Sequence, residues 1–182
     1  MLLSLMLVAR LTSGFAALMD GGGTTVPYRV RGTDTLTRAV IDEGCRRSPV
    51  FANLVQDVER SKFVVYVEAV GALRNGKQGA LLHYTNEAQY LRIYVRRDLQ
   101  TRDQIAVLAH ELQHVREMVQ AGISANADEM DMLFRQIGRE PVVRGERQQL
   151  ETSKALRVGD LVAQDLRRMH GPNISFCRAP IQ

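Results

Sequence analysis

The spacing of apolar residues predicts two helices near the start of the folded chain, after a Gly- and Thr-rich linker at 20–33. The first helix is expected over 35–47, with Asp34 as its N-cap. Ser48 and Pro49 begin the second, because Ser is a favourable N-cap and Pro is tolerated in the first helical turn. The apolar face of this second helix consists of Phe51, Leu54, Val55 and Val58.

Three segments rich in β-branched and aromatic residues follow, and each predicts a strand. They are "FVVYVEAV" at 63–70, "GALLHYTN" at 79–86 and "YLRIYVRR" at 90–97. In the last segment apolar residues alternate with Tyr and Arg, so one face is expected to be buried and the other polar. The polar face would consist of Tyr90, Arg92, Tyr94 and Arg96. We therefore expect a small three-stranded sheet.

Helical periodicity returns at 101–120 and, after a short break, at 125–137. Residues 138–148 contain Gly, Pro and several charges and are expected to form a loop before a last long helix over 149–169. The order of helices, a small sheet and three further helices predicts an α+β fold. A chain of 182 residues suits one such domain, which we place at 34–182.

The most apolar stretch of the chain is its first segment, residues 1–19. An apolar run followed by small residues predicts a secretory signal peptide or an N-terminal anchor, and therefore export to the periplasm or the exterior. Arg10 inside the segment is costly for a membrane span and leaves a buried N-terminal helix in a cytoplasmic protein as the other interpretation. We expect no stable membrane span beyond this segment.

Two cysteines, Cys45 and Cys177, lie far apart in the sequence. In an exported protein they could form one disulfide that ties the C-terminal tail to the N-terminal region, whereas otherwise they would be two separate thiols. Neither has the CxxC spacing of a metal or redox motif, so we assign them no catalytic role.

The charge balance gives little support for a nucleic-acid partner. The chain has 24 Lys and Arg against 20 Asp and Glu, a net charge of +4. The Tyr and Arg residues that alternate at 90–96 could stack on bases, but a solvated strand face is the favoured explanation. We therefore expect no nucleic acid as a partner.

The stretch "AHELQHV" at 109–115 carries the strongest chemical signal. His110 and His114 are four residues apart, so they stack on one helix face and both imidazoles can reach one zinc ion. Glu111 projects beside them and can accept a proton from a zinc-activated water. The core-facing stripe of this helix is a separate set: Ile105, Leu108, Leu112, Val115 and Val119. The positions left for solvent are Ala109, Gln113, Arg116 and Glu117.

A catalytic zinc site needs a third protein ligand, and Glu151 in "QQLETSKALRVGDLV" is our first choice. It lies near the start of the last predicted helix, where the chain can return across the metal helix. The second choices are a loop carboxylate and two imidazoles: Glu146, His83 and His170. Glu129 and Asp131, by contrast, are expected to be solvated or to cap their own helix.

An HELQH motif followed much later by a helical glutamate resembles the gluzincin class of zinc metallopeptidases. The compact order of helix, sheet and metal helix is similar to the minigluzincins and to small bacterial proteins that carry HELQH and a downstream "ET" helix. The resemblance covers residues 60–165 and implies a zincin-like fold. It also implies that His110, His114 and Glu151 bind Zn²⁺ and that Glu111 is the general base.

The same resemblance implies how a peptide or protein substrate would be held. In gluzincins an edge strand before the metal helix commonly pairs with the extended substrate, which makes Arg92 and Tyr94 candidates for substrate binding. A Tyr, His or Arg usually stabilises the oxyanion, and the candidates here are Arg157 and His170. Some gluzincins have an acidic residue four positions after the ligand glutamate, whereas this chain has Ala155 there.

The sequence thus favours a zinc-dependent metallopeptidase in which Glu111 acts as the general base. The alternative is a catalytically inactive, zinc-stabilised binding module with the same fold. The residue that discriminates them is Glu111, because an enzyme needs it and a binding module does not.

Overall fold

The computed structural model describes residues 28–83, 89–138, 151–168 and 177. Within these residues it has an α+β fold of five α-helices, a short 3-10 helix and a four-stranded mixed sheet. The elements in chain order are β1 (Val30–Gly32), α1 (Thr35–Arg47), α2 (Pro49–Glu59), β2 (Val64–Val70), η1 (Arg74–Gly76), β3 (Gly79–His83), β4 (Tyr90–Arg96), α3 (Thr101–Ala121), α4 (Ala127–Ile137) and α5 (Ser153–Arg168).

The sheet has the strand order β1-β2-β4-β3, and it corrects two predictions. It has four strands rather than three, because β1 lies inside the segment predicted to be a linker. In addition β4, predicted to be the edge strand, lies between β2, to which it is parallel, and β3, to which it is antiparallel. The edge next to β4 is therefore formed by β3. A three-residue strand is too short to show a periodicity, and strand order is not encoded in any local pattern.

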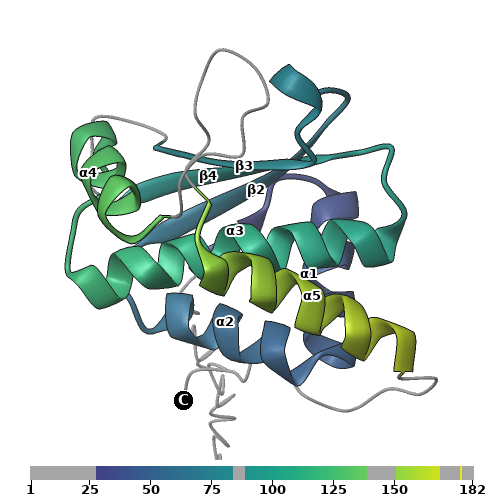
Figure 1. Ribbon diagram of the computed structural model, residues 1–182. Helices are drawn as coiled ribbons and strands as arrows, with labels where there is room; N and C mark the ends of the chain where they lie inside the picture. The colour runs from purple at the N-terminus through teal and green to yellow at the C-terminus, as the bar shows by residue number, and fades with distance from the viewer. Residues whose placement is uncertain (1–27, 84–88, 139–150, 169–176, 178–182) are drawn as a thin grey trace, which may run out of the picture.

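Helices α1, α2, α3 and α5 lie on one face of the sheet (Figure 1). Helix α3 lies directly under the strands and has α2 and α5 on its far side, so it is the central element of the fold. The core between these layers contains Leu91 and Ile93 of β4 and Ile105, Leu108 and Leu112 of α3, all fully buried. The alternation in β4 thus turns its apolar residues toward α3, as the sequence predicted.

The helix starts follow their caps. Asp34 accepts a hydrogen bond from the backbone of Thr37 in a capping box, and Ser48 caps α2 with Pro49 in the first turn, which confirms both predictions. Helix α5 is shorter than the predicted 149–169, because it begins at Ser153. The hydroxyl of Thr152 accepts a hydrogen bond from the backbone N–H of Ala155, so Thr152 caps α5.

Cys45 of α1 and Cys177 form a disulfide across a sequence separation of 132 residues, and both side chains are buried. Of the two interpretations of these cysteines, the disulfide is therefore the correct one. The predicted signal or anchor segment at 1–19 lies outside the described residues. In the part of the chain that the structure describes, no helix combines the length and apolar character needed to cross a membrane.

Candidate metal centre

Helix α3 positions the candidate site, and this helix is buried on almost every side. Ala109, Gln113 and Glu117 are all buried, although the helical pattern assigned them to solvent. Arg116 alone of that predicted solvent face is partly exposed, and it pairs with Asp57 of α2. The prediction was wrong because a helical wheel shows which residues share a face but not how many neighbouring elements cover the helix.

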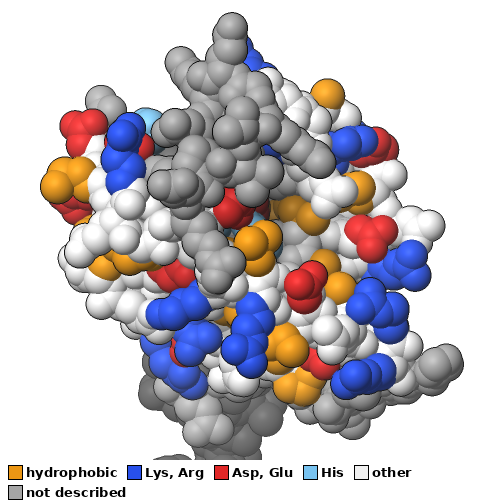
Figure 2. All heavy atoms as spheres, viewed as in Figure 1, with side chains coloured by type: hydrophobic (Ala, Val, Ile, Leu, Met, Phe, Trp, Pro, Cys, Tyr) orange, Lys and Arg blue, Asp and Glu red, His pale blue; other side chains and the backbone are white. Residues whose placement is uncertain are grey.

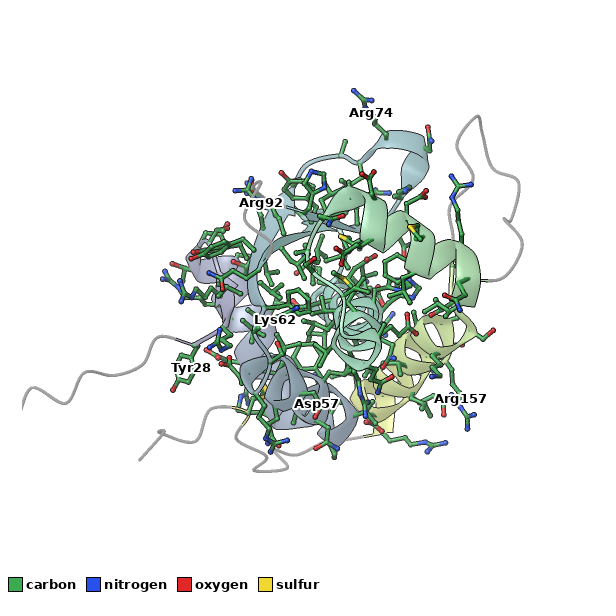
Figure 3. All side chains as sticks on the ribbon, turned by 90° about the vertical axis from the view of Figure 1, so that its left-hand side faces the viewer. Tyr28, Asp57, Lys62, Arg74, Arg92 and Arg157 are labelled. Atoms are coloured by element: carbon green, nitrogen blue, oxygen red, sulfur yellow. A yellow bond between two sulfur atoms is a disulfide. The ribbon has the colours of Figure 1, made fainter. Side chains whose placement is uncertain are left out.

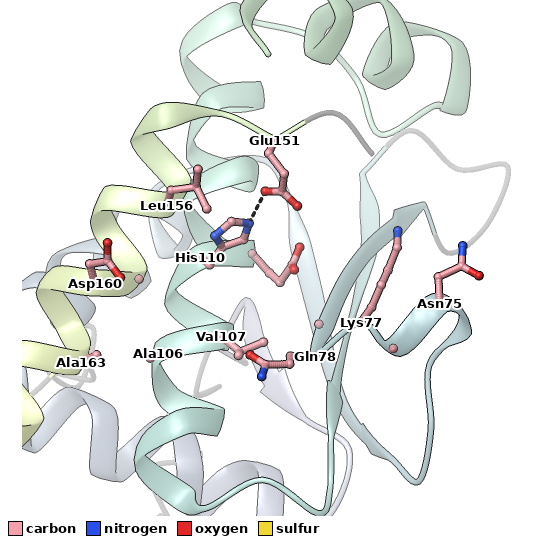
Figure 4. A pocket seen from close by; sticks show the side chains of 14 residues that line it. Asn75, Lys77, Gln78, Ala106, Val107, His110, Glu151, Leu156, Asp160 and Ala163 are labelled. Atoms are coloured by element: carbon pink, nitrogen blue, oxygen red, sulfur yellow. Dashed lines mark ion pairs between the residues drawn. The ribbon is translucent and has the colours of Figure 1, made fainter. Parts of the chain in front are cut away.

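His110 and His114 direct their Nε2 atoms toward the same point. These two atoms are 3.2 Å apart, and the rings meet edge to face, as the four-residue spacing on a helix predicts. An oxygen of Glu151 lies 2.8 Å from His110 Nε2 and 3.9 Å from His114 Nε2 (Figure 4). The three side chains each offer a ligand atom within 4.8 Å of the other two, so this group could hold a metal ion.

Helix α5 brings Glu151 to the histidines by packing closely on α3. Ala155 is fully buried, and a Cβ on Gly159 would lie 3.4 Å from Ala106 O and 3.6 Å from His110 Cβ. Small residues at these two positions let the helices approach each other. Glu151, two residues before α5, consequently lies next to His110 (Figure 4). Sequence reasoning placed Glu151 in the ligand set, and the structure brings it there.

Glu117 supports His114 from the side opposite the ligand group, and sequence reasoning missed it. Its carboxylate is 3.1 Å from His114 Nδ1 and accepts a 2.8 Å hydrogen bond from the hydroxyl of Thr152. With Nδ1–H donated to Glu117, His114 presents Nε2 to the metal position. The missing acidic residue at Ala155 is thus replaced by one on α3 itself. The three-residue spacing from His114 to Glu117 was the signal that could have identified it.

The carboxylates of this group favour positive charge on the His114 imidazole. Burial lowers the pKa of His114, but the hydrogen bond to Glu117 and the nearby carboxylate of Glu151 outweigh burial and raise that pKa to about 9. Burial raises the pKa of Glu151, but its close contact with His110 and the nearby imidazole of His114 outweigh burial and lower it to about 2. A proton and a divalent cation compete for the same nitrogen lone pair, so a site that holds protons this firmly is also suited to a cation.

Glu111 lies beside the ligand group and faces β3. Its side chain is buried, and burial raises its pKa, with the neighbouring His114 and His110 acting in the opposite direction. Gly79 of β3 makes room for it, because a Cβ there would lie 2.8 Å from Glu111 Oε1 and 2.5 Å from Val107 Cγ1. Glu111 thus lines a cleft between α3, α5 and the chain leading into β3, next to the metal ligands rather than among them.

The structure places Arg92, Tyr94 and Arg157 outside the ligand group. Arg92 lies on the face of the sheet opposite α3 (Figure 3), where its guanidinium is 3.2 Å from the Tyr94 hydroxyl and 3.3 Å from Glu68. The pleat that buries Leu91 and Ile93 necessarily turns Arg92 away from α3. Arg157 is exposed and points outward from α5 (Figure 3).

The other candidates are placed away from the ligand group or lie outside the described residues. His83 is exposed at the end of β3. Glu129 accepts hydrogen bonds from Ser124 at the start of α4, and Asp131 pairs with Arg135, as expected of residues that serve their own helix. The two residues outside the described ranges are Glu146 and His170.

Comparison of the chain with protein-family models, with curated proteins and with solved structures finds no match. The function is therefore inferred from the site itself.

Proposed function

We propose that this chain is a zinc-dependent metallopeptidase of the gluzincin class with a zincin-like fold. The single observation that carries the proposal is the convergence of His110, His114 and Glu151 on one point. Two histidines and a carboxylate form a ligand set typical of catalytic zinc, which takes three protein ligands and leaves a position for water. Two tetrahedral ligands at 2.0–2.1 Å lie roughly 3.3 Å apart, close to the 3.2 Å between the imidazole nitrogens.

The surroundings of the ligands also fit zinc. Metal-binding histidines usually donate their second N–H to a carboxylate, and Glu117 is in that position for His114. The buried network of Glu117, Thr152 and Gln113 leaves the histidine little freedom to turn. A zinc ion bound here would polarise a peptide carbonyl and lower the pKa of a water molecule.

Glu111 supplies the proton transfer that peptide hydrolysis needs. Its side chain lines the cleft beside His110, and it is buried close to the candidate metal position. Its raised pKa suits a group that takes a proton from the attacking water and delivers it to the leaving amine. Because Glu111 is not one of the three ligands, its carboxylate is available for this transfer.

Strand β3 is the better candidate for holding an extended substrate, in place of β4. The strand order ends at β3, so among the described strands its outer edge has no neighbour, and an extended peptide could pair with it. The strand itself passes beside Glu111 at Gly79. A substrate backbone along β3 would therefore lie close to the proposed base.

We also propose that the protein is exported. The buried disulfide between Cys45 and Cys177 supports this, because disulfides persist in oxidising compartments and are rare in the cytosol. The segment 1–19 would then act as a signal peptide or anchor.

The test compares zinc content and hydrolysis in four proteins: the parent, Glu111→Gln, His110→Ala and Glu151→Ala. We expect one zinc per chain in the parent and in Glu111→Gln, and loss of zinc in the other two. Hydrolysis of an unfolded protein substrate should occur in the parent only, with Glu111→Gln reduced by at least about 100-fold. Full activity in Glu111→Gln would refute the assigned base. A zinc-loaded parent without hydrolysis would instead favour the zinc-stabilised binding module.

A further inference from the structure

The cleft beside the candidate metal centre extends well beyond the residues that the proposed reaction uses. Its volume is about 390 Å³, within the range of pockets that bind small ligands. From His110 and Glu111 it runs between α5 on one side and residues 75–79 on the other (Figure 4). A peptide cleaved at the metal would place one of its side chains in this space.

The walls on the helix side suit an aliphatic stem. Helix α3 contributes Ala106 and Val107, and α5 contributes Leu156, Gly159 and Ala163. None of these side chains has a polar group, and three of the five are no larger than a methyl group. A long, thin side chain could therefore lie along this wall with its methylene groups in apolar contact.

Helix α5 adds the carboxylate of Asp160 to this cleft, besides those of Glu111 and Glu151 at its metal end. Asp160 is exposed, and within the described residues it makes no ion pair or hydrogen bond, so its charge is available to a ligand. Lys77 lines the opposite wall, and its positive charge faces Glu111 across the cleft (Figure 4). Along α5 the cleft is thus apolar apart from the carboxylate of Asp160.

The basic residues of α5 do not neutralise this wall. Lys154 and Arg157 are exposed, and Figure 2 shows blue Lys and Arg side chains gathered over the lower part of this face, where α5 and α2 lie. Neither Lys154 nor Arg157 lines the cleft. Among the described residues that line the cleft, Lys77 on the opposite wall is the only Lys or Arg.

We propose that this cleft binds an arginine or lysine side chain of the substrate, with the aliphatic stem along α3 and α5 and the cationic end at Asp160. An apolar side chain would make no ion pair with the carboxylate, whereas an acidic one would be repelled by it. Arginine and lysine combine a methylene stem that matches the apolar wall with a positive charge that can pair with Asp160. The assignment rests on the proposed peptidase function, because it specifies a residue next to the bond that is cleaved.

The first experiment measures binding rather than hydrolysis. The zinc-loaded protein is titrated with Nα-acetyl-L-arginine methylamide and with the corresponding citrulline derivative, which has nearly the same shape but no charge. We expect the arginine derivative to bind about fivefold more tightly, a size typical of a solvent-accessible ion pair. The preference should disappear in Asp160→Asn and persist in Asp128→Asn, which removes an exposed carboxylate of α4 and changes the net charge equally. Equal binding of both derivatives by the parent, or a preference that survives Asp160→Asn, would overturn the proposal.

The second experiment maps the bonds cleaved in a mixture of unstructured peptides. We expect Arg and Lys to be enriched on one side of the cleaved bond in the parent and in Asp128→Asn, but not in Asp160→Asn. Cleavage without this enrichment refutes the assignment of the cleft and leaves the peptidase function intact. Binding of the arginine derivative through Asp160 without any cleavage refutes the peptidase function and supports a binding pocket at the same place.

Discussion

At the scale of single residues, Glu117 connects the two parts of the chain that supply the candidate ligands. One of its oxygens holds the Nδ1 atom of His114, and the other accepts a hydrogen bond from Thr152, the neighbour of Glu151. The carboxylate therefore fixes the ring of one ligand and the backbone beside another. Its side chain is 3% exposed, so both interactions take place out of contact with water.

We expect Glu117→Gln to weaken zinc binding by about 10- to 100-fold. The amide is uncharged, so it accepts the hydrogen bond from the N–H of His114 more weakly than the carboxylate does. Zinc competition with a chromophoric chelator measures this change. The matched control is Gln113→Ala, which removes a weaker 3.4 Å contact to the same carboxylate and should change the affinity less. Unchanged affinity in Glu117→Gln would mean that the orientation of His114 is set by packing, for example by the ring of Phe134.

The sequence identified the group of His110, His114 and Glu151 because a fixed spacing on one helix and a single carboxylate before another limit the choices. It could not place Arg92 and Arg157 relative to this group, because their positions depend on which face of a strand or helix is covered. That information lies in the packing of α3 between the sheet and α5, and no local pattern carries it.

At the scale of secondary-structure elements, the caps show most clearly how local sequence sets structure. Asp34 ends the turn after β1 and begins α1 through the reciprocal hydrogen bonds of a capping box with Thr37. This contact is local, and it was predicted from the sequence together with the start of α2 at Ser48. Strand order was not predictable in the same way, since β1 and β2 pair in parallel across the whole α1–α2 connection.

We expect Asp34→Ala to lower the free energy of unfolding by about 1 kcal/mol at neutral pH, the usual cost of losing an N-cap. Hydrogen bonds from the backbone and side chain of Thr37 lower the pKa of Asp34 in the folded protein. A group with a lowered folded pKa stabilises the protein above its unfolded pKa, which is about 3.9, and this contribution is lost as the pH falls through the folded value. The stability difference between parent and Asp34→Ala should therefore shrink below about pH 4.

Urea unfolding of both proteins between pH 7 and pH 3 measures this difference. Asp34→Asn is the matched control, because Asn also caps helices well but does not titrate. Its free energy of unfolding should be close to that of the parent at pH 7, and it should lack the loss of stability at low pH that comes from the titration of Asp34. A difference between parent and Asp34→Ala that stays constant down to pH 3 would show that the charge of Asp34 does not contribute to the cap.

At the scale of the whole molecule, the site depends on how α5 is held against α3. The start of α5 is attached at the candidate metal centre through Thr152 and Glu117, and its end is attached to the α1–α2 junction, where Ser48 donates a hydrogen bond to Asp165. The disulfide joins α1 to Cys177, nine residues beyond the end of α5. The chain after α3 is thus joined to the N-terminal helices at two places. The sequence did not decide whether Cys45 and Cys177 form a disulfide, because the separation of two cysteines in a chain does not determine their distance in the fold.

Closing a loop of 132 residues restricts the unfolded chain far more than the folded one. We therefore expect the double variant Cys45→Ala, Cys177→Ala to lose about 2–5 kcal/mol of unfolding free energy relative to the oxidised parent. Zinc content should stay at one per chain in the folded variant, since neither cysteine belongs to the ligand group.

Thermal unfolding with and without a thiol reductant that does not bind zinc provides the control. The reductant should destabilise the parent and leave the double variant unchanged. If the reduced parent unfolds at the same temperature as the oxidised one, the disulfide contributes no stability. The hydrogen bonds that join α5 to α2 and α3 must then hold α5 in place on their own.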